Sequence, residues 1–265
     1  MPDAKEPHFF AQNLSARYCR IKTETEYLNL FKPATDEQIC GEASVLYGYY
    51  PNCLKDILQW NPQAKFIVMI RDPVAFLPSY HRQLYNNMDE DILDCEQAYY
   101  AWEQRKKGYN VPKTNHDIDL LDYKQACSIG DYLTNITNII PTQQLYIGLL
   151  DDMQGDPHSF YKEILKFLDV SIDHVPSFDK KNSAYVMQSR HLQKMQQSNN
   201  LVLKLIKAMI KRTGMPIGAW IQRLNKKEQK TPPLSAEFKQ KLYRDLQPQY
   251  NLIQQITKRD LSQTS

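Results

Sequence analysis

An arginine and a serine near the end of an apolar run are the residues in this chain best suited to bind a phosphate. Residues 66–70 form a continuous apolar run with branched side chains, typical of a strand buried on both faces of a parallel sheet. The run ends at Arg71, and Pro73 prevents further strand pairing. Ligands of open α/β sheets bind at the carboxyl ends of strands. The guanidinium of Arg71 and the hydroxyl of Ser79 could therefore hold a phosphate through charge-assisted hydrogen bonds.

The same arginine has a structural interpretation of equal weight. A strand-end arginine can instead pair with a neighbouring carboxylate, and Asp72 follows Arg71 directly. The chain also contains only 8 glycines, although loops that cradle phosphates are usually rich in glycine. This segment alone favours neither interpretation.

The elements that position these residues alternate between strands and helices. A second apolar run at 145–150 is the expected parallel partner of 66–70. A proline in the first turn favours a helix over 73–87, and another favours a helix over 156–168. This alternation predicts a single α/β domain, residues 1–265, with a parallel sheet. Other expected elements are helices within 23–31, 51–60, 89–105, 121–139 and 235–250, a short strand and turn at 40–44, and a loop at 106–117.

Composition excludes several classes of protein. The formal net charge of +3 is too small to indicate bulk nucleic-acid binding, but it is compatible with one local anion site. The 5 cysteines are scattered and contain no C-x-x-C pair, which argues against a zinc site or a disulfide framework and favours a cytoplasmic location. The 6 histidines are also dispersed, so we expect no metal. We expect no membrane span, because no segment approaches the roughly 20 apolar residues it requires.

Several segments resemble, in the right order, one enzyme family. The chain resembles the bacterial sulfotransferases that use 3′-phosphoadenosine 5′-phosphosulfate and are similar to the heparan-sulfate sulfotransferases. The order and spacing of the segments make the resemblance specific. It implies a P-loop-like three-layer α/β fold, with a central parallel sheet flanked by helices. The segments are KEPHFF at 5–10 (family KExxFF), GEASVLY at 41–47 (GE(K/A)SxxY), 71–79 (RDPxxRxxS), 145–168 (strand, acidic turn and "FL" helix) and 233–262 (a helix and closing RDLS).

The resemblance implies an enzyme that transfers a sulfuryl group from this co-substrate to an acceptor hydroxyl of a glycan or small molecule. Glu6 matches the family's general base, and His8 is expected to orient the acceptor or share the proton. Arg71 and Ser79 match the 3′-phosphate motif, and Arg190 falls where the family has a loop that closes over the nucleotide. The reaction depends on positioning and charge stabilisation and requires no metal.

These positions also have structural interpretations. Glu6 could be a solvated glutamate near the N-terminus, and His8 a partly buried structural histidine. Glu42 and Ser44 could line the acceptor side, or Glu42 could only pair with a nearby base. The aromatic stretch at 99–109 could offer stacking surfaces for a sugar, although such residues more often pack.

Three features depart from the family pattern. Phe76 stands where the family often has a second arginine, which is expected to weaken nucleotide affinity. Ala43 stands where some members have a lysine. The largest departure is the N-terminal strand and phosphosulfate-binding loop, which in the family precede KExxFF and are missing here, because Met1 lies four residues before Lys5.

We expect that the start was assigned too far downstream. The alternative is a truncated, catalytically inactive protein that keeps the fold for binding. A nucleotide kinase would share the architecture, but it leaves 6–10 and 71–79 unexplained. Since the absent strand belongs at the centre of the sheet, we expect the 265-residue chain to be poorly soluble and to bind the nucleotide weakly.

Overall fold

The computed structural model describes residues 5–12, 19, 21–173, 176–178, 185–187, 226–228, 232–259 and 261. Two units emerge, each assembled from segments far apart in the sequence. The first comprises Met1–Phe76, Asp122–Phe178 and Glu237–Ser265, and the second comprises Leu77–Leu121 and Asp179–Ala236. That the whole chain forms one domain stays a prediction.

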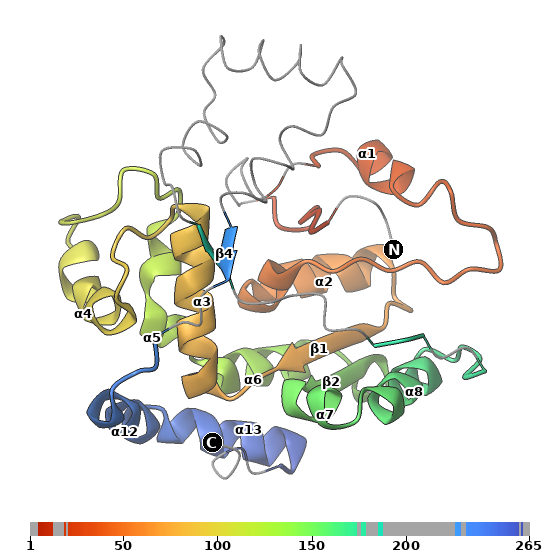
Figure 1. Cartoon of the computed structure of the whole chain (residues 1–265). Helices are drawn as coiled ribbons and strands as arrows, with labels where there is room; N and C mark the ends of the chain where they lie inside the picture. The colour runs from red at the N-terminus through yellow and green to blue at the C-terminus, as the bar shows by residue number, and fades with distance from the viewer. Residues whose placement is uncertain are drawn as a thin grey trace. The chain divides into compact units, whose positions relative to one another are not determined.

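The first unit contains the predicted parallel strands. β1 (Phe66–Ile70) pairs in parallel with β2 (Leu145–Leu149), with Phe66 opposite Leu145 and Ile70 opposite Leu149 (Figure 1). Burial on both faces was a wrong prediction for β1, because Ile67 and Met69 are 39% and 42% exposed. Side chains on β1 alternate between its two faces, and only one face points into the core cluster.

On that core face, the sheet packs against two amphipathic helices. Phe66 and Val68 contact a buried cluster that includes Leu54. Leu54 belongs to α2 (Pro51–Trp60), and α6 (Ile129–Ile139) contributes to the same cluster. The predicted helix over 51–60 is thus confirmed, and it covers one face of the strand that leads to Arg71.

The opposite face meets α8 (Pro157–Phe167), close to its predicted bounds. A Cβ built on Gly148 would lie 2.6 Å from Cζ of Phe160 and 2.9 Å from Sδ of Met69. Only glycine therefore lets the helix approach β2 so closely. The mixed α/β class is confirmed by these elements, and the three-layer P-loop-like arrangement stays a prediction.

Helix α3 (Pro73–Asn87) has the predicted bounds and begins directly after the strand-end arginine. The carboxylate of Asp72 accepts hydrogen bonds from the backbone N–H of Ala75 at 2.6 Å and from the Tyr250 hydroxyl at 2.5 Å. Tyr250 belongs to α13 (Gln247–Thr257), so this buried contact joins the C-terminal helix to the start of α3.

Three other predictions need correction. The helix expected over 89–105 starts only at Cys95, because Met88 has a left-handed backbone with φ 68° and Glu90 turns its carboxylate inward to Arg105. The helical stretch expected over 121–139 is divided into three elements: η2 (Ile118–Leu121), α5 (Tyr123–Ala126), which Asp122 caps, and α6. Residues 40–44 form no strand, and a 3₁₀ helix follows them.

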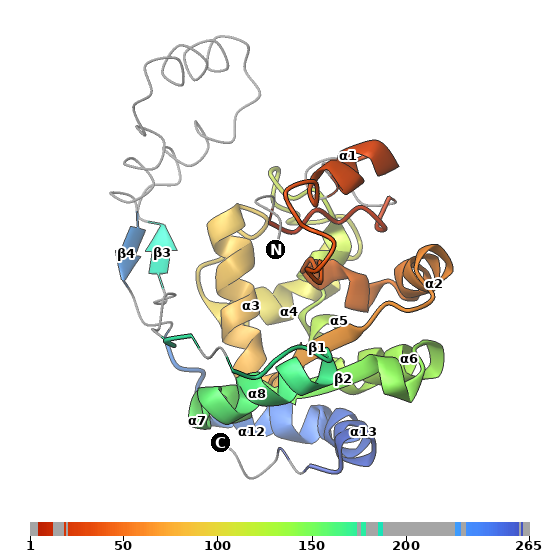
Figure 2. The ribbon, with the colours of Figure 1, turned by 90° about the vertical axis from the view of Figure 1, so that its right-hand side faces the viewer.

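The remaining elements are short or peripheral. The helix predicted from 235 to 250 is present as α12 (Ala236–Asp245) followed by α13, and the loop over 106–117 is confirmed. Within the described ranges, no helix has the length and apolar character needed to cross a bilayer. The other described elements are α1 (Glu24–Asn29), η1 (Val45–Tyr49), α4 (Cys95–Arg105), η3 (Thr142–Gln144), α7 (Leu150–Gly155) and the antiparallel pair β3 (Tyr185–Met187) and β4 (Lys226–Glu228) (Figure 2).

Candidate functional site

Aromatic packing fixes the KEPHFF segment in the first unit. The ring of Phe9 stacks on Tyr27, with centroids 4.6 Å apart. Phe10 meets Tyr27, Tyr47 and Trp60 edge-on at 5.5, 6.1 and 5.7 Å. Edge-to-face contacts of this kind each add about 0.5–1.5 kcal/mol beyond the area that they bury. The two phenylalanines therefore anchor the residues that precede them.

The backbone of this segment is strained at the two predicted catalytic residues. Glu6 and His8 have φ angles of 52° and 51°, in the left-handed region that non-glycine residues rarely occupy. Such conformations cost on the order of 1–3 kcal/mol each and persist only where surrounding contacts enforce them. Their effect here is to bring the two side chains together, with Nε2 of His8 3.6 Å from Oε2 of Glu6.

The charge state of Glu6 suits a proton acceptor. The neighbouring His8 imidazole, aided by the positive charge of Lys5, lowers the pKa of Glu6 below its ordinary value of 4.5, although burial opposes the shift. Glu6 is therefore a carboxylate at neutral pH. Its side chain is 37% exposed and remains accessible, whereas the His8 side chain is only 3% exposed.

The GEAS segment, residues 41–44, contacts the backbone of His8. The backbone N–H of His8 donates to Oγ of Ser44 at 3.0 Å, and that hydroxyl donates to Oε2 of Glu42 at 2.6 Å. The N–H of Phe10 donates to the Tyr47 hydroxyl at 3.2 Å. Burial and the Glu42 carboxylate raise the pKa of Tyr47, so this hydroxyl stays protonated. The segments 5–10 and 41–47, which both resemble motifs of the same family, are thus in direct contact.

The proposed phosphate residues follow the strand as expected. Arg71 lies at the carboxyl end of β1 and is partly buried. Both oxygens of Asp72 are engaged by the start of α3 and by α13, so this carboxylate acts as a helix cap. Ser79 lies about two turns into α3, in the second unit. Arg190 lies outside the described residues.

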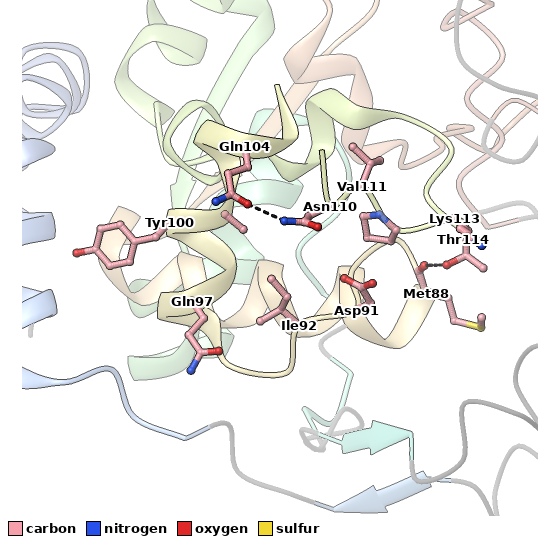
Figure 3. Close-up of a pocket in the computed structure, with 12 residues that line it drawn as sticks. Met88, Asp91, Ile92, Gln97, Tyr100, Gln104, Asn110, Val111, Lys113 and Thr114 are labelled. Atoms are coloured by element: carbon pink, nitrogen blue, oxygen red, sulfur yellow. Dashed lines mark hydrogen bonds between the residues drawn. The ribbon is translucent and has the colours of Figure 1, made fainter. Parts of the chain in front are cut away.

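Sequence reasoning did not identify a pocket of about 1090 Å³ in the second unit (Figure 3). The same unit contains a buried ion pair, in which NH1 and NH2 of Arg105 donate to Oε2 and Oε1 of Glu90, both at 2.6 Å. Its spacing of 15 residues matches no local pattern that could have revealed it. The pocket is lined by Met88, Asp91, Ile92, Gln97, Tyr100, Ala101, Gln104, Asn110, Val111, Pro112, Lys113 and Thr114.

Titratable side chains do not gather into a metal site in the part of the chain that the structure describes. No group of three or more histidine, cysteine, aspartate or glutamate residues there could hold a metal ion.

Comparison with known proteins identifies the fold. No family profile matches the sequence, and no curated protein is similar to it at a significant level. The chain is similar in structure to a sulfotransferase from Alicyclobacillus acidocaldarius, with a TM-score of 0.68 and 19% sequence identity. The similarity covers 98% of this chain and 86% of that protein. At this identity the finding establishes a shared fold: the chain has a sulfotransferase-like α/β fold.

Proposed function

We propose that this protein is a sulfotransferase that moves a sulfuryl group from 3′-phosphoadenosine 5′-phosphosulfate to a hydroxyl of a glycan or a small molecule. The observation that supports it most is the Glu6–His8 pair, held at 3.6 Å by a strained backbone in a chain with the fold of a sulfotransferase. The fold suggests sulfuryl transfer, and the pair offers the base that the reaction needs.

In the proposed reaction, the acceptor oxygen attacks sulfur in line with the 5′-phosphate. The new O–S bond forms while the bond from sulfur to the 5′-phosphate oxygen breaks, and 3′-phosphoadenosine 5′-phosphate leaves with the electron pair. Glu6 takes the proton of the acceptor hydroxyl, because it is a carboxylate at neutral pH and is accessible. The imidazole of His8 orients the acceptor or shares that proton. Most of the rate enhancement comes from positioning and charge stabilisation.

The donor nucleotide is assigned to the strand end. The guanidinium of Arg71 follows β1, where open α/β sheets bind their ligands, and its planar fork matches a phosphate. We assign it to the 3′-phosphate. Ser79 and Arg190 are further proposed nucleotide contacts.

Replacing Arg71 with alanine tests the donor assignment. We expect Arg71→Ala to weaken binding of 3′-phosphoadenosine 5′-phosphate by about 1.5–3 kcal/mol, roughly 10- to 150-fold, the scale of a hydrogen bond to a charged group. The variant should also lose the preference for this nucleotide over adenosine 5′-phosphate, which lacks the 3′ group. Isothermal titration calorimetry measures both.

A matched control lies at the opposite end of the same strand. Lys65 precedes β1 and pairs with Asp169 at 2.5 Å. Lys65→Ala removes one positive charge without touching the proposed site, so its nucleotide affinity should equal that of the wild type. Equal affinities for Arg71→Ala and the wild type would refute the assignment. Binding of the nucleotide without transfer of labelled sulfate to any acceptor would instead favour the non-catalytic binding protein.

A further inference from the structure

We infer that Ser44 is a positioning residue: its hydroxyl, held by Glu42, fixes the backbone of His8 and so keeps the Glu6–His8 pair assembled. This inference deepens the proposed function and rests on it. Ser44 lies 36 residues from His8 and acts through the His8 backbone.

The first argument is the conformation that must be maintained. Two non-glycine residues separated only by Pro7 both have left-handed φ angles, at 52° and 51°. Conformations of this kind need an external partner that over-determines them. Ser44 is such a partner, because the His8 backbone N–H donates a hydrogen bond to Ser44 Oγ at 3.0 Å.

The second argument is the orientation of the Ser44 hydroxyl. A serine hydroxyl has one proton to donate and lone pairs to accept. Here the proton goes to Glu42 Oε2 at 2.6 Å, so a lone pair faces the N–H of His8. The carboxylate acceptor makes this a charge-assisted hydrogen bond, which is stronger than a neutral one. Glu42 thus fixes the direction in which Ser44 accepts.

The third argument is that little else directs the His8 ring. Its Nδ1 is buried and has no hydrogen-bond partner among the residues that the structure describes. Its Nε2 lies 3.6 Å from Oε2 of Glu6, and the ring meets Tyr47 edge-on with centroids 6.0 Å apart. Since Nδ1 makes no hydrogen bond among the described residues and the Glu6 side chain is itself 37% exposed, the ring also depends on the His8 backbone for its position. Tyr47 supports the same segment through the N–H of Phe10.

The test compares three serine variants. Ser44→Ala removes the acceptor, Ser44→Thr keeps a hydroxyl, and Ser171→Ala is the matched control. The Ser171 hydroxyl also donates to a carboxylate two residues away, that of Asp173, and accepts a hydrogen bond from the backbone N–H of Asp173. We expect Ser44→Ala to lower kcat about 10- to 100-fold, the effect of misplacing reacting groups by about 1 Å. KM for the acceptor and Kd for 3′-phosphoadenosine 5′-phosphate should change less than about twofold, Ser44→Thr should restore most of kcat, and Ser171→Ala should match the wild type.

A second readout does not depend on activity. In protein labelled with ¹⁵N-histidine, the His8 imidazole signals are identified by their loss in His8→Gln. We expect a single sharp set in the wild type and in Ser44→Thr, and shifted or broadened signals in Ser44→Ala. That pattern in a protein without sulfuryl transfer would support the positioning role of Ser44 and refute the proposed function. Wild-type kcat and unchanged His8 signals in Ser44→Ala would refute the positioning role of Ser44 without affecting the proposed function.

Discussion

At the residue scale, the chemistry of Glu6 depends on its immediate neighbours. The nearby His8 imidazole and the Lys5 charge lower its pKa, and partial burial opposes them. Because folding lowers this pKa, the interaction stabilises the folded protein at neutral pH, and this stabilisation is lost as the pH falls through the folded pKa. The same sign governs activity, since only the carboxylate form accepts a proton.

The pH dependence of kcat/KM therefore distinguishes Glu6 from His8 as the base. We expect activity to persist as the pH falls to about 5 and to decline only below 4.5, the ordinary value for a glutamate. In His8→Gln, the residual activity should decline at a higher pH than in the wild type, because the group that lowers the Glu6 pKa is absent. Tryptophan fluorescence in the same buffers shows whether the protein remains folded. A wild-type decline centred near pH 6.5, where an ordinary histidine titrates, would assign the base to His8 instead.

At the element scale, two helical glycines differ in how closely other atoms approach them. A Cβ on Gly130 of α6 would lie 2.7 Å from the backbone oxygen of Gln249 and 2.8 Å from Cβ of Leu252, both in α13. Since a backbone atom cannot swing away, we expect Gly130→Ala to destabilise the protein by about 1–3 kcal/mol. Gly155 has no atom within 4 Å of its built Cβ, so Gly155→Ala should leave stability unchanged or raise it slightly. Urea unfolding followed by circular dichroism compares the two, and equal midpoints would contradict the described contact.

Local signals in the sequence predicted most elements of the first unit. The apolar runs and the prolines placed β1, β2, α2, α3 and α8 close to their observed bounds. The failures involve long-range contacts. Glu90 lies outside the expected helix and pairs with Arg105, and at the end of 40–44, which form no strand, the Ser44 hydroxyl accepts a hydrogen bond from the His8 backbone. Neither partner is close enough in sequence to leave a local pattern.

In the candidate site, too, the sequence indicated the residues but not the long-range contacts that arrange them. The resemblance to a known family pointed to Glu6, and the position of His8 two residues later suggested the second residue. In the structure, Nε2 of His8 lies 3.6 Å from Oε2 of Glu6. Sequence alone could not reveal their left-handed backbones or the Ser44 contact, because both depend on a segment 36 residues away. Arg71 stands at the strand end that the apolar run predicted.

At the scale of the whole molecule, most of the proposed site residues lie in the first unit, whereas the proposed nucleotide contact Ser79 lies in the second. Glu6, His8, Ser44 and Arg71 all belong to the first unit, whose sheet, helices and N-terminal aromatic cluster hold them. The second unit contains the pocket and the buried Glu90–Arg105 pair. The small net charge of +3 does not indicate binding of polyanions along the surface, and it is compatible with one local anion site.

The most direct test of the central claim is the turnover of Glu6→Gln, measured as transfer of radiolabelled sulfate from 3′-phosphoadenosine 5′-phosphosulfate to an acceptor polysaccharide or small molecule. Glutamine keeps the size of the side chain but cannot accept the proton. We predict transfer by the wild type, a loss of about a hundredfold or more in kcat for Glu6→Gln, and nearly unchanged nucleotide affinity. A Glu6→Gln protein that transfers sulfate at the wild-type rate would contradict the account.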